Sequence, residues 1–147
     1  MKHVLAFLTA ALALPQAPST TYTQCQAADQ IHKNGLDSLS GATLGDWICL
    51  TKYESSWNTN VIGPMNSDGT YDYGFFQIND YYWCYSSGQP KYNDCNIDCS
   101  KLIDNSLTDD SKCAKTIYNR HGYSAWYGWI NHCKGKDNSH YASECGY

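Results

Sequence analysis

Two carboxyl residues, Glu54 and Asp72, have the types and surroundings that acid-assisted bond cleavage requires. Glu54 is one of two glutamates in the chain, and Tyr53 and Trp57 lie beside it in the sequence. A carboxyl next to aromatic rings is costly to ionise, so its pKa rises and it can serve as a general acid. Asp72 lies in the polar segment DGTYDYG, where hydrogen bonds keep a carboxylate ionised.

This pair fits the cleavage of a glycosidic bond. One carboxyl protonates the leaving oxygen, and the other meets the oxocarbenium-like carbon. The spacing alone is more typical of two solvated surface residues, so the pair needs support from the rest of the chain.

The elements that must position these carboxyls follow from local patterns. Helical spacing predicts a first helix from Cys25 that stops at Gly35. A second helix is predicted over 44–55, with Thr43 as its cap and Glu54 in its last turn. A third is predicted over 109–120, followed by shorter helical pieces over 125–130.

Residues 58–82 have a different pattern, with turn clusters and short aromatic or β-branched runs. Asp68 and Gly69 form a hairpin signal within this stretch. The order of elements predicts an α+β fold, in which a helical part and a small antiparallel sheet flank a cleft. Trp47 and Trp129 are expected in the core.

Composition limits the classes of protein that need consideration. The chain has 147 residues, of which 42% are hydrophobic and 16% charged, which predicts one folded domain. Its net charge is -4 and Arg120 is its only arginine, which argues against nucleic acid or an anionic membrane as a partner.

The amino-terminal segment predicts secretion. Residues 1–19 combine a basic start, a short apolar run and small residues at a possible cleavage point, as secretory signals do. We therefore expect a signal peptide over 1–19 and the folded domain over 20–147. No later apolar run is long enough to cross a membrane.

All eight cysteines lie beyond this segment. An even count in a secreted chain predicts four disulfides rather than a zinc site, because no CxxC pair is present. Counting leaves 105 pairings open.

The decisive signal is a resemblance that spans the domain. The segments that carry it are KYESSWNTN (52–60), SDGTYDYGFFQIN (67–79), YWC (82–84), CNIDCS (95–100), CAKTIY (113–118), AWYGW (125–129) and NHCKG (131–135). They resemble animal c-type lysozymes, with an invertebrate character in NVIGPMN and NDYYWC. The resemblance implies the lysozyme-like α+β fold and the disulfides Cys25–Cys145, Cys49–Cys133, Cys84–Cys99 and Cys95–Cys113.

The resemblance also implies roles for individual residues. Glu54 matches the proton donor, and Asp72 matches the nucleophile or charge stabiliser of a retaining glycosidase. The implied substrate-binding residues are Asn66, Gln77, Asn79, Tyr82, Trp83, Ala125 and Trp126. The two asparagines would support the nucleophile and the sugar N-acetyl group, and Gln77 would line the cleft. Tyr82 and Trp83 would form a platform for sugar rings, and Trp126 would pack against the acid.

A second candidate site lies in the segment 99–113. Its three aspartates face no clear cation, and a hard divalent cation with oxygen ligands would neutralise them. The segment resembles the loop of lactalbumins and calcium-binding lysozymes, which implies ligation by Lys101, Asp104, Ser106, Asp109 and Asp110, the first and third through main-chain carbonyls. In the alternative interpretation, Asp109 and Asp110 merely complement the start of a helix. Catalysis itself would need no cofactor.

The function that the resemblance implies is a secreted, monomeric lysozyme. Its substrate would be the β-1,4 bond between N-acetylmuramic acid and N-acetylglucosamine in bacterial peptidoglycan, with chitin oligomers as a poorer substrate. The role would be antibacterial defence or digestion, and the acidic balance favours digestion. The alternative is a non-catalytic sugar-binding or partner-modulating protein on the same scaffold, a class that usually lacks one of the two carboxyls.

Overall fold

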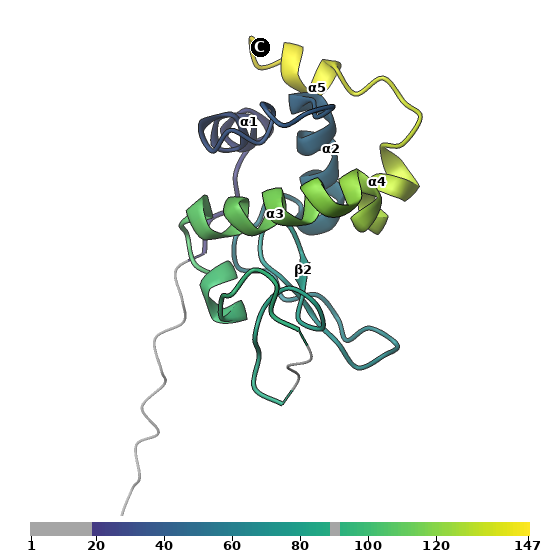
Figure 1. Ribbon diagram of the computed structural model, residues 1–147. Coiled ribbons are helices and arrows are strands. Elements are labelled where there is room, and N and C mark those ends of the chain that lie inside the picture. Colours follow the sequence, from purple (N-terminus) through teal and green to yellow (C-terminus); the bar gives the residue numbers. More distant parts are fainter. Residues whose placement is uncertain (1–18, 89–91) are drawn as a thin grey trace, which may run out of the picture.

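The computed structural model describes residues 19–88 and 92–147, and it divides into a helical part and a loop-rich part (Figure 1). The predicted signal segment lies outside the described residues, apart from Ser19. The helices are α1 (Gln24–Lys33), α2 (Leu44–Ser55), α3 (Leu107–His121), α4 (Tyr127–His132) and α5 (His140–Ser143), with short 3-10 helices η1 (Cys99–Leu102) and η2 (Gly122–Ala125). Helix α3 crosses the molecule, with α1, α2 and α5 on one side and the loops around β2 on the other.

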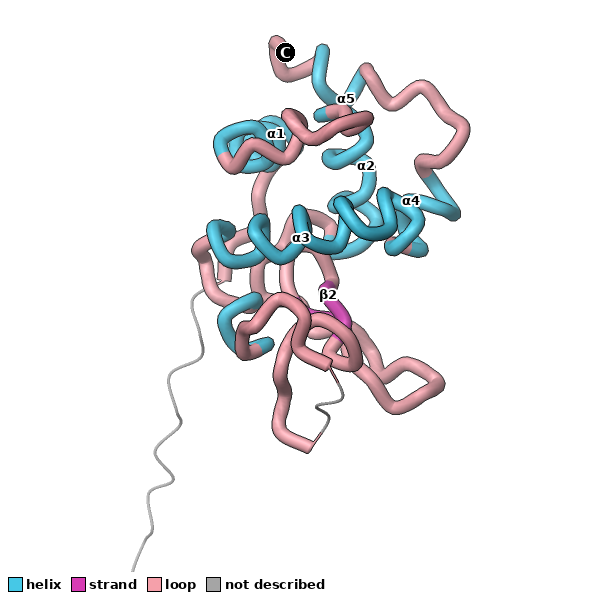
Figure 2. Tube along the Cα trace, in the orientation of Figure 1, coloured by secondary structure: helices cyan, strands magenta, loops and turns pink. Residues whose placement is uncertain are grey.

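The two strands, β1 (Asp72–Tyr73) and β2 (Ile78–Asn79), are a small part of the loop-rich lobe (Figure 2). The antiparallel pairing places Asp72 opposite Asn79. The predicted α+β plan, a helical lobe with a small antiparallel sheet, is therefore confirmed. Within the described ranges, no helix has the length and apolar character needed to cross a membrane.

Helix α2 has the predicted bounds, and its ends have clear physical causes. The Thr43 hydroxyl accepts a hydrogen bond from the backbone N–H of Asp46 at 3.0 Å, which satisfies one of the free donors at the helix start. The helix ends where Ser56 adopts a left-handed conformation, with φ of 52°. Glu54 is thereby held in the last turn.

The other helices differ from their predicted bounds by a few residues. Helix α1 begins one residue early, at Gln24, because Thr23 and Gln26 form a capping box before it. Helix α3 begins at Leu107 rather than Asp109, since the buried Leu107 side chain anchors its first turn. The predicted piece over 125–130 is instead the end of η2 followed by α4.

The turn expected at Asp68 and Gly69 is present, and the segments on either side of it pair antiparallel through the Ile62–Tyr73 bridge. A bond from Asn66 N–H to the Thr70 carbonyl closes this turn, and residues 74–77 form the next turn, which joins β1 to β2. Gly74 is required in the joining turn, because a Cβ there would lie 1.7 Å from the Leu102 carbonyl oxygen.

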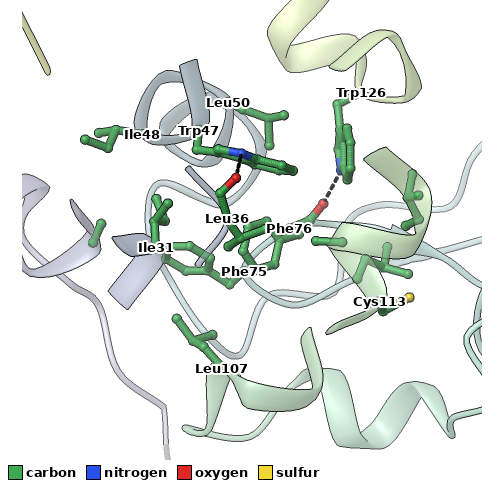
Figure 3. Packing of buried hydrophobic residues seen from close by; sticks show 14 of the residues in the cluster. Ile31, Leu36, Trp47, Ile48, Leu50, Phe75, Phe76, Leu107, Cys113 and Trp126 are labelled. Carbon is green, nitrogen blue, oxygen red and sulfur yellow. Dashed lines mark hydrogen bonds between the residues drawn. The ribbon is translucent and has the colours of Figure 1, made fainter. Parts of the chain in front are cut away.

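The core joins the two parts of the molecule (Figure 3). Trp47 of α2 is fully buried and meets Phe76 of the β1–β2 turn edge to face, with ring centroids 5.8 Å apart. The Trp126 indole donates to the Phe76 carbonyl at 2.8 Å. Trp47 is thus a core residue as predicted, whereas Trp129 is only partly buried.

Four disulfides close the chain on itself. The pairs are Cys25–Cys145, Cys49–Cys133, Cys84–Cys99 and Cys95–Cys113, the pairings that the resemblance implies. Each restricts the unfolded chain and adds about 2–4 kcal/mol to the free energy of unfolding.

Candidate active site

A cleft of about 540 Å³ separates the helical lobe from the strands and their loops. All nine residues expected at the catalytic and substrate-binding positions line it: Glu54, Asn66, Asp72, Gln77, Asn79, Tyr82, Trp83, Ala125 and Trp126. The lining also includes residues that sequence reasoning missed, among them Thr70 and Tyr127. Residues from distant parts of the sequence therefore meet in one groove, whose volume is in the range of small-molecule binding sites.

Glu54 enters the cleft from the last turn of α2. Its Oε1 accepts a hydrogen bond from the backbone N–H of Gly128 at 2.8 Å. Burial raises the pKa of Glu54 to about 7, the Gly128 bond opposes this rise, and the negative charge of Asp72 adds to it. The carboxyl therefore keeps its proton close to neutral pH, as a general acid must.

The cause of this raised pKa differs from the one expected from sequence neighbours. Tyr53 is 43% exposed and stacks on His132, with ring centroids 4.0 Å apart. Neither Tyr53 nor Trp57 lines the cleft that Glu54 enters. Trp126 and the Gly128 backbone, far from Glu54 in sequence, line and bound its niche.

Asp72 is held by two amide side chains. Asn79 donates to its Oδ1 at 2.9 Å, and Asn66 donates to its Oδ2 at 3.1 Å. Asp72 thus presents a fixed negative group on the opposite lobe from Glu54.

Thr70 connects the two amides that hold Asp72. Its buried hydroxyl accepts from Asn66 at 3.1 Å and from Asn79 at 2.9 Å, and it donates to Asp68 Oδ1 at 2.6 Å. Sequence reasoning missed this residue, although the Asp-Gly-Thr turn was a signal that could have indicated it, because Asp and Thr often bond across such turns.

The remaining predicted cleft residues divide into exposed and buried groups. Tyr82 is 51% exposed, whereas Trp83 is 8% and Trp126 4% exposed. Of these three predicted rings, Tyr82 alone offers an open face. Gln77 lines the cleft, but its amide N–H groups donate to the Val61 and Gly74 carbonyls. Gln77 therefore also ties down the turn between β1 and β2.

Beyond Tyr82 the groove opens into a second depression of about 470 Å³. Tyr82, Trp83 and Ala125 line both the cleft and this depression, and Arg120, His121 and Ser124 complete it. The Arg120 guanidinium lies over the Trp83 ring and also pairs with Asp94.

The five predicted calcium ligands are only partly brought together. Lys101, Asp104 and Asp109 line a shallow pocket of about 430 Å³, which Asp110 does not reach. Asp110 is fully buried, and neither carboxyl oxygen has a hydrogen-bond partner. Across residues 19–88 and 92–147, no three Asp, Glu, His or Cys side chains gather in a way that could hold a metal ion. The donors are of the type that calcium prefers, but this arrangement is not a finished site.

Glycoside hydrolases use a pair of carboxyl residues, one of which donates a proton. The cleft contains such a pair, a glutamic acid that keeps its proton and an aspartate held by two amides. The sequence matches the C-type lysozyme/alpha-lactalbumin family over residues 20–145, and the chain belongs to this family. It is an enzyme, a glycoside hydrolase of the lysozyme type.

Individual relatives agree with this assignment. The chain is 47% identical to a lysozyme of Galleria mellonella over 116 residues, which cover 79% of this chain and 93% of the relative. It is 47% identical to lysozyme c-1 of Anopheles gambiae over a stretch that covers 82% of this chain and 81% of the relative. A calcium binding lysozyme from equine milk has a similar structure, with a TM-score of 0.81, 38% identity and coverage of 87% of this chain and 100% of that one.

Proposed function

We propose that the enzyme hydrolyses the β-1,4 bond between N-acetylmuramic acid and N-acetylglucosamine in bacterial peptidoglycan, with retention at the anomeric carbon. The observation that supports this most strongly is the difference in surroundings between the two carboxyls. Burial raises the pKa of Glu54 to about 7, while two amides bond to Asp72 and stabilise its charge.

The proposed reaction has two steps. Glu54 donates its proton to the glycosidic oxygen as the bond to the anomeric carbon breaks, and an Asp72 oxygen bonds to or stabilises that carbon. A water molecule then attacks the same carbon, gives a proton to Glu54 and releases Asp72. The enzyme returns to its starting state, and no cofactor takes part.

We further propose that the protein is secreted and acts as a monomer against bacteria, in defence or digestion. The signal-like segment 1–19 and four disulfides support an extracellular location. Chitin oligomers, which offer the same β-1,4 linkage without the lactyl group, are the proposed poorer substrate.

Release of reducing ends from purified peptidoglycan tests this function. Glu54→Gln keeps the shape of the side chain but removes its proton, so we expect a loss of about 100-fold or more in rate. Glu144→Gln is the matched control, because Glu144 is the only other glutamate and lies exposed near the carboxyl end. NMR of the first anomer formed reports retention. Equal and negligible rates for the wild type and Glu54→Gln would instead support the non-catalytic alternative.

We also propose that calcium binds the loop that contains Lys101, Asp104, Ser106, Asp109 and Asp110. The two unpartnered, buried oxygens of Asp110 support this, as does the structural similarity to a calcium binding lysozyme. Binding requires a rearrangement that brings Asp104, Asp109 and Asp110 around one ion.

The calcium proposal predicts a change in thermal stability. Calcium added to chelator-treated protein at low salt should raise the melting temperature by at least about 3 °C, because a ligand that binds only the native state stabilises it. Asp110→Asn should abolish the response. Melting curves that are the same with calcium and with chelator would leave the aspartates only their role at the start of α3.

A further inference from the structure

Tyr127 is an exposed aromatic ring in the catalytic cleft. It is 79% exposed, more than any other large hydrophobic side chain in the described part of the chain, and it lines the cleft with Glu54. Its neighbours in sequence are packed: Trp126 meets the Trp47 ring and Trp129 stacks on Tyr123. Among residues 19–88 and 92–147, the Tyr127 ring has no aromatic partner. A bare ring in a polar groove is suited to contact a ligand.

The segment that carries Tyr127 indicates toward which end of the cleft the ring lies. The segment 125–128 runs from Ala125, which borders the second depression, to Gly128, whose N–H holds Glu54. Tyr127 lines the cleft but not that depression. It therefore adjoins in the chain the residue that holds the acid, and it lies outside the depression that Tyr82 and Trp83 also line.

We propose that Tyr127 is the stacking platform for the sugar on the leaving-group side of the scissile bond. This inference rests on the proposed glycosidase function. Glu54 delivers its proton to the oxygen of the departing sugar, so that sugar must lie next to the carboxyl and its holding segment. The C–H face of a pyranose ring is apolar and packs on a flat aromatic ring, while the hydroxyls at its edge stay in water.

The same platform serves the second step when a sugar replaces water. A hydroxyl of an acceptor sugar attacks the anomeric carbon, gives its proton to Glu54 and forms a new glycosidic bond, while the bond to Asp72 breaks. The acceptor occupies the side that the departing sugar left, so it needs the Tyr127 ring. Water needs no such surface. Tyr127 thus favours transfer to sugars relative to hydrolysis.

Two substrates with different leaving groups, each compared between variant and wild type, separate this role from a general one. Soluble peptidoglycan glycan strands have a sugar on the departing side, whereas the β-glycosyl fluoride of an N-acetylglucosamine oligomer releases fluoride, which cannot stack. For Tyr127→Ala, kcat/KM on the strands should fall about tenfold, equivalent to about 1.4 kcal/mol. Fluoride hydrolysis should stay within about twofold of the wild type, since its transition state makes no contact with the ring.

Control variants complete the test. Tyr127→Phe keeps the ring and should behave as the wild type on both substrates. Tyr147→Ala, which removes a 48% exposed tyrosine at the carboxyl end, should change neither rate. An equal fall on both substrates for Tyr127→Ala, or no fall on the strands, overturns the proposal. Wild-type protein that is inactive on both substrates overturns the glycosidase function itself.

Discussion

At the scale of single residues, the chemistry depends on how Glu54 is held. Burial raises its pKa to about 7, and the hydrogen bond from Gly128 acts in the opposite direction. That bond also fixes the direction in which the carboxyl points. Gly128 is the residue that permits this approach, because a Cβ there would lie 2.7 Å from Glu54 Oε1.

Gly128→Ala should therefore impair catalysis more than folding. The added methyl group displaces the Glu54 side chain rather than a backbone segment, since its nearest neighbours are Glu54 side-chain atoms. A misplaced acid should lower kcat by about 10- to 100-fold. Alanine suits a helix better than glycine, so the melting temperature should change little. Unchanged kcat with a large loss of stability would contradict this description of the niche.

At the scale of elements, the sequence was most informative where a local signal decided the structure. Thr43 and the apolar spacing after it predicted α2 correctly, because capping and periodicity are properties of neighbouring residues. The hairpin signal at Asp68 and Gly69 correctly marked a turn between paired segments. The second turn, over 74–77, was not predicted, because Gly74 there is required by its close approach to Leu102, which is distant in sequence.

The candidate site shows the same difference between local signals and contacts that depend on the fold. The resemblance placed all nine cleft residues, since a family motif already includes the effect of the fold. Reasoning from neighbours gave Glu54 the correct direction of pKa shift from an incomplete cause, as Tyr53 does not line the cleft. Thr70 and Tyr127 were missed because their importance lies in hydrogen bonds and exposure, which only the three-dimensional arrangement defines.

Helix α2 also offers a test at this scale. Thr43→Ala removes the side-chain bond to Asp46 N–H and should lower the free energy of unfolding by about 1 kcal/mol. Ser106→Ala is the matched control, because Ser106 begins α3 without a side-chain cap bond. Denaturant unfolding should show a change within about 0.5 kcal/mol for this control. Equal losses for the two variants would refute the capping assignment.

At the scale of the whole molecule, the cleft exists because two lobes are joined rigidly on one side. The disulfides Cys49–Cys133 and Cys84–Cys99 each close one lobe, and the packing of Trp47, Phe76 and Trp126 joins the two. The net charge of -4 adds no general attraction to anionic cell walls. Recognition must therefore come from the contacts inside the cleft.

The central claim is that Glu54 keeps its proton until near neutral pH, and NMR measures this directly. Glutamate labelled with ¹³C at the carboxyl carbon gives two signals, because the chain has only two glutamates, and Glu54→Gln identifies the one that belongs to Glu54. We predict that this signal titrates with a pKa of about 7, so that the acid is progressively lost, and the hydrolysis rate falls, as the pH rises through that value. A pKa near the ordinary value of 4.5 would contradict the account, because Glu54 would then be ionised at neutral pH and unable to donate a proton.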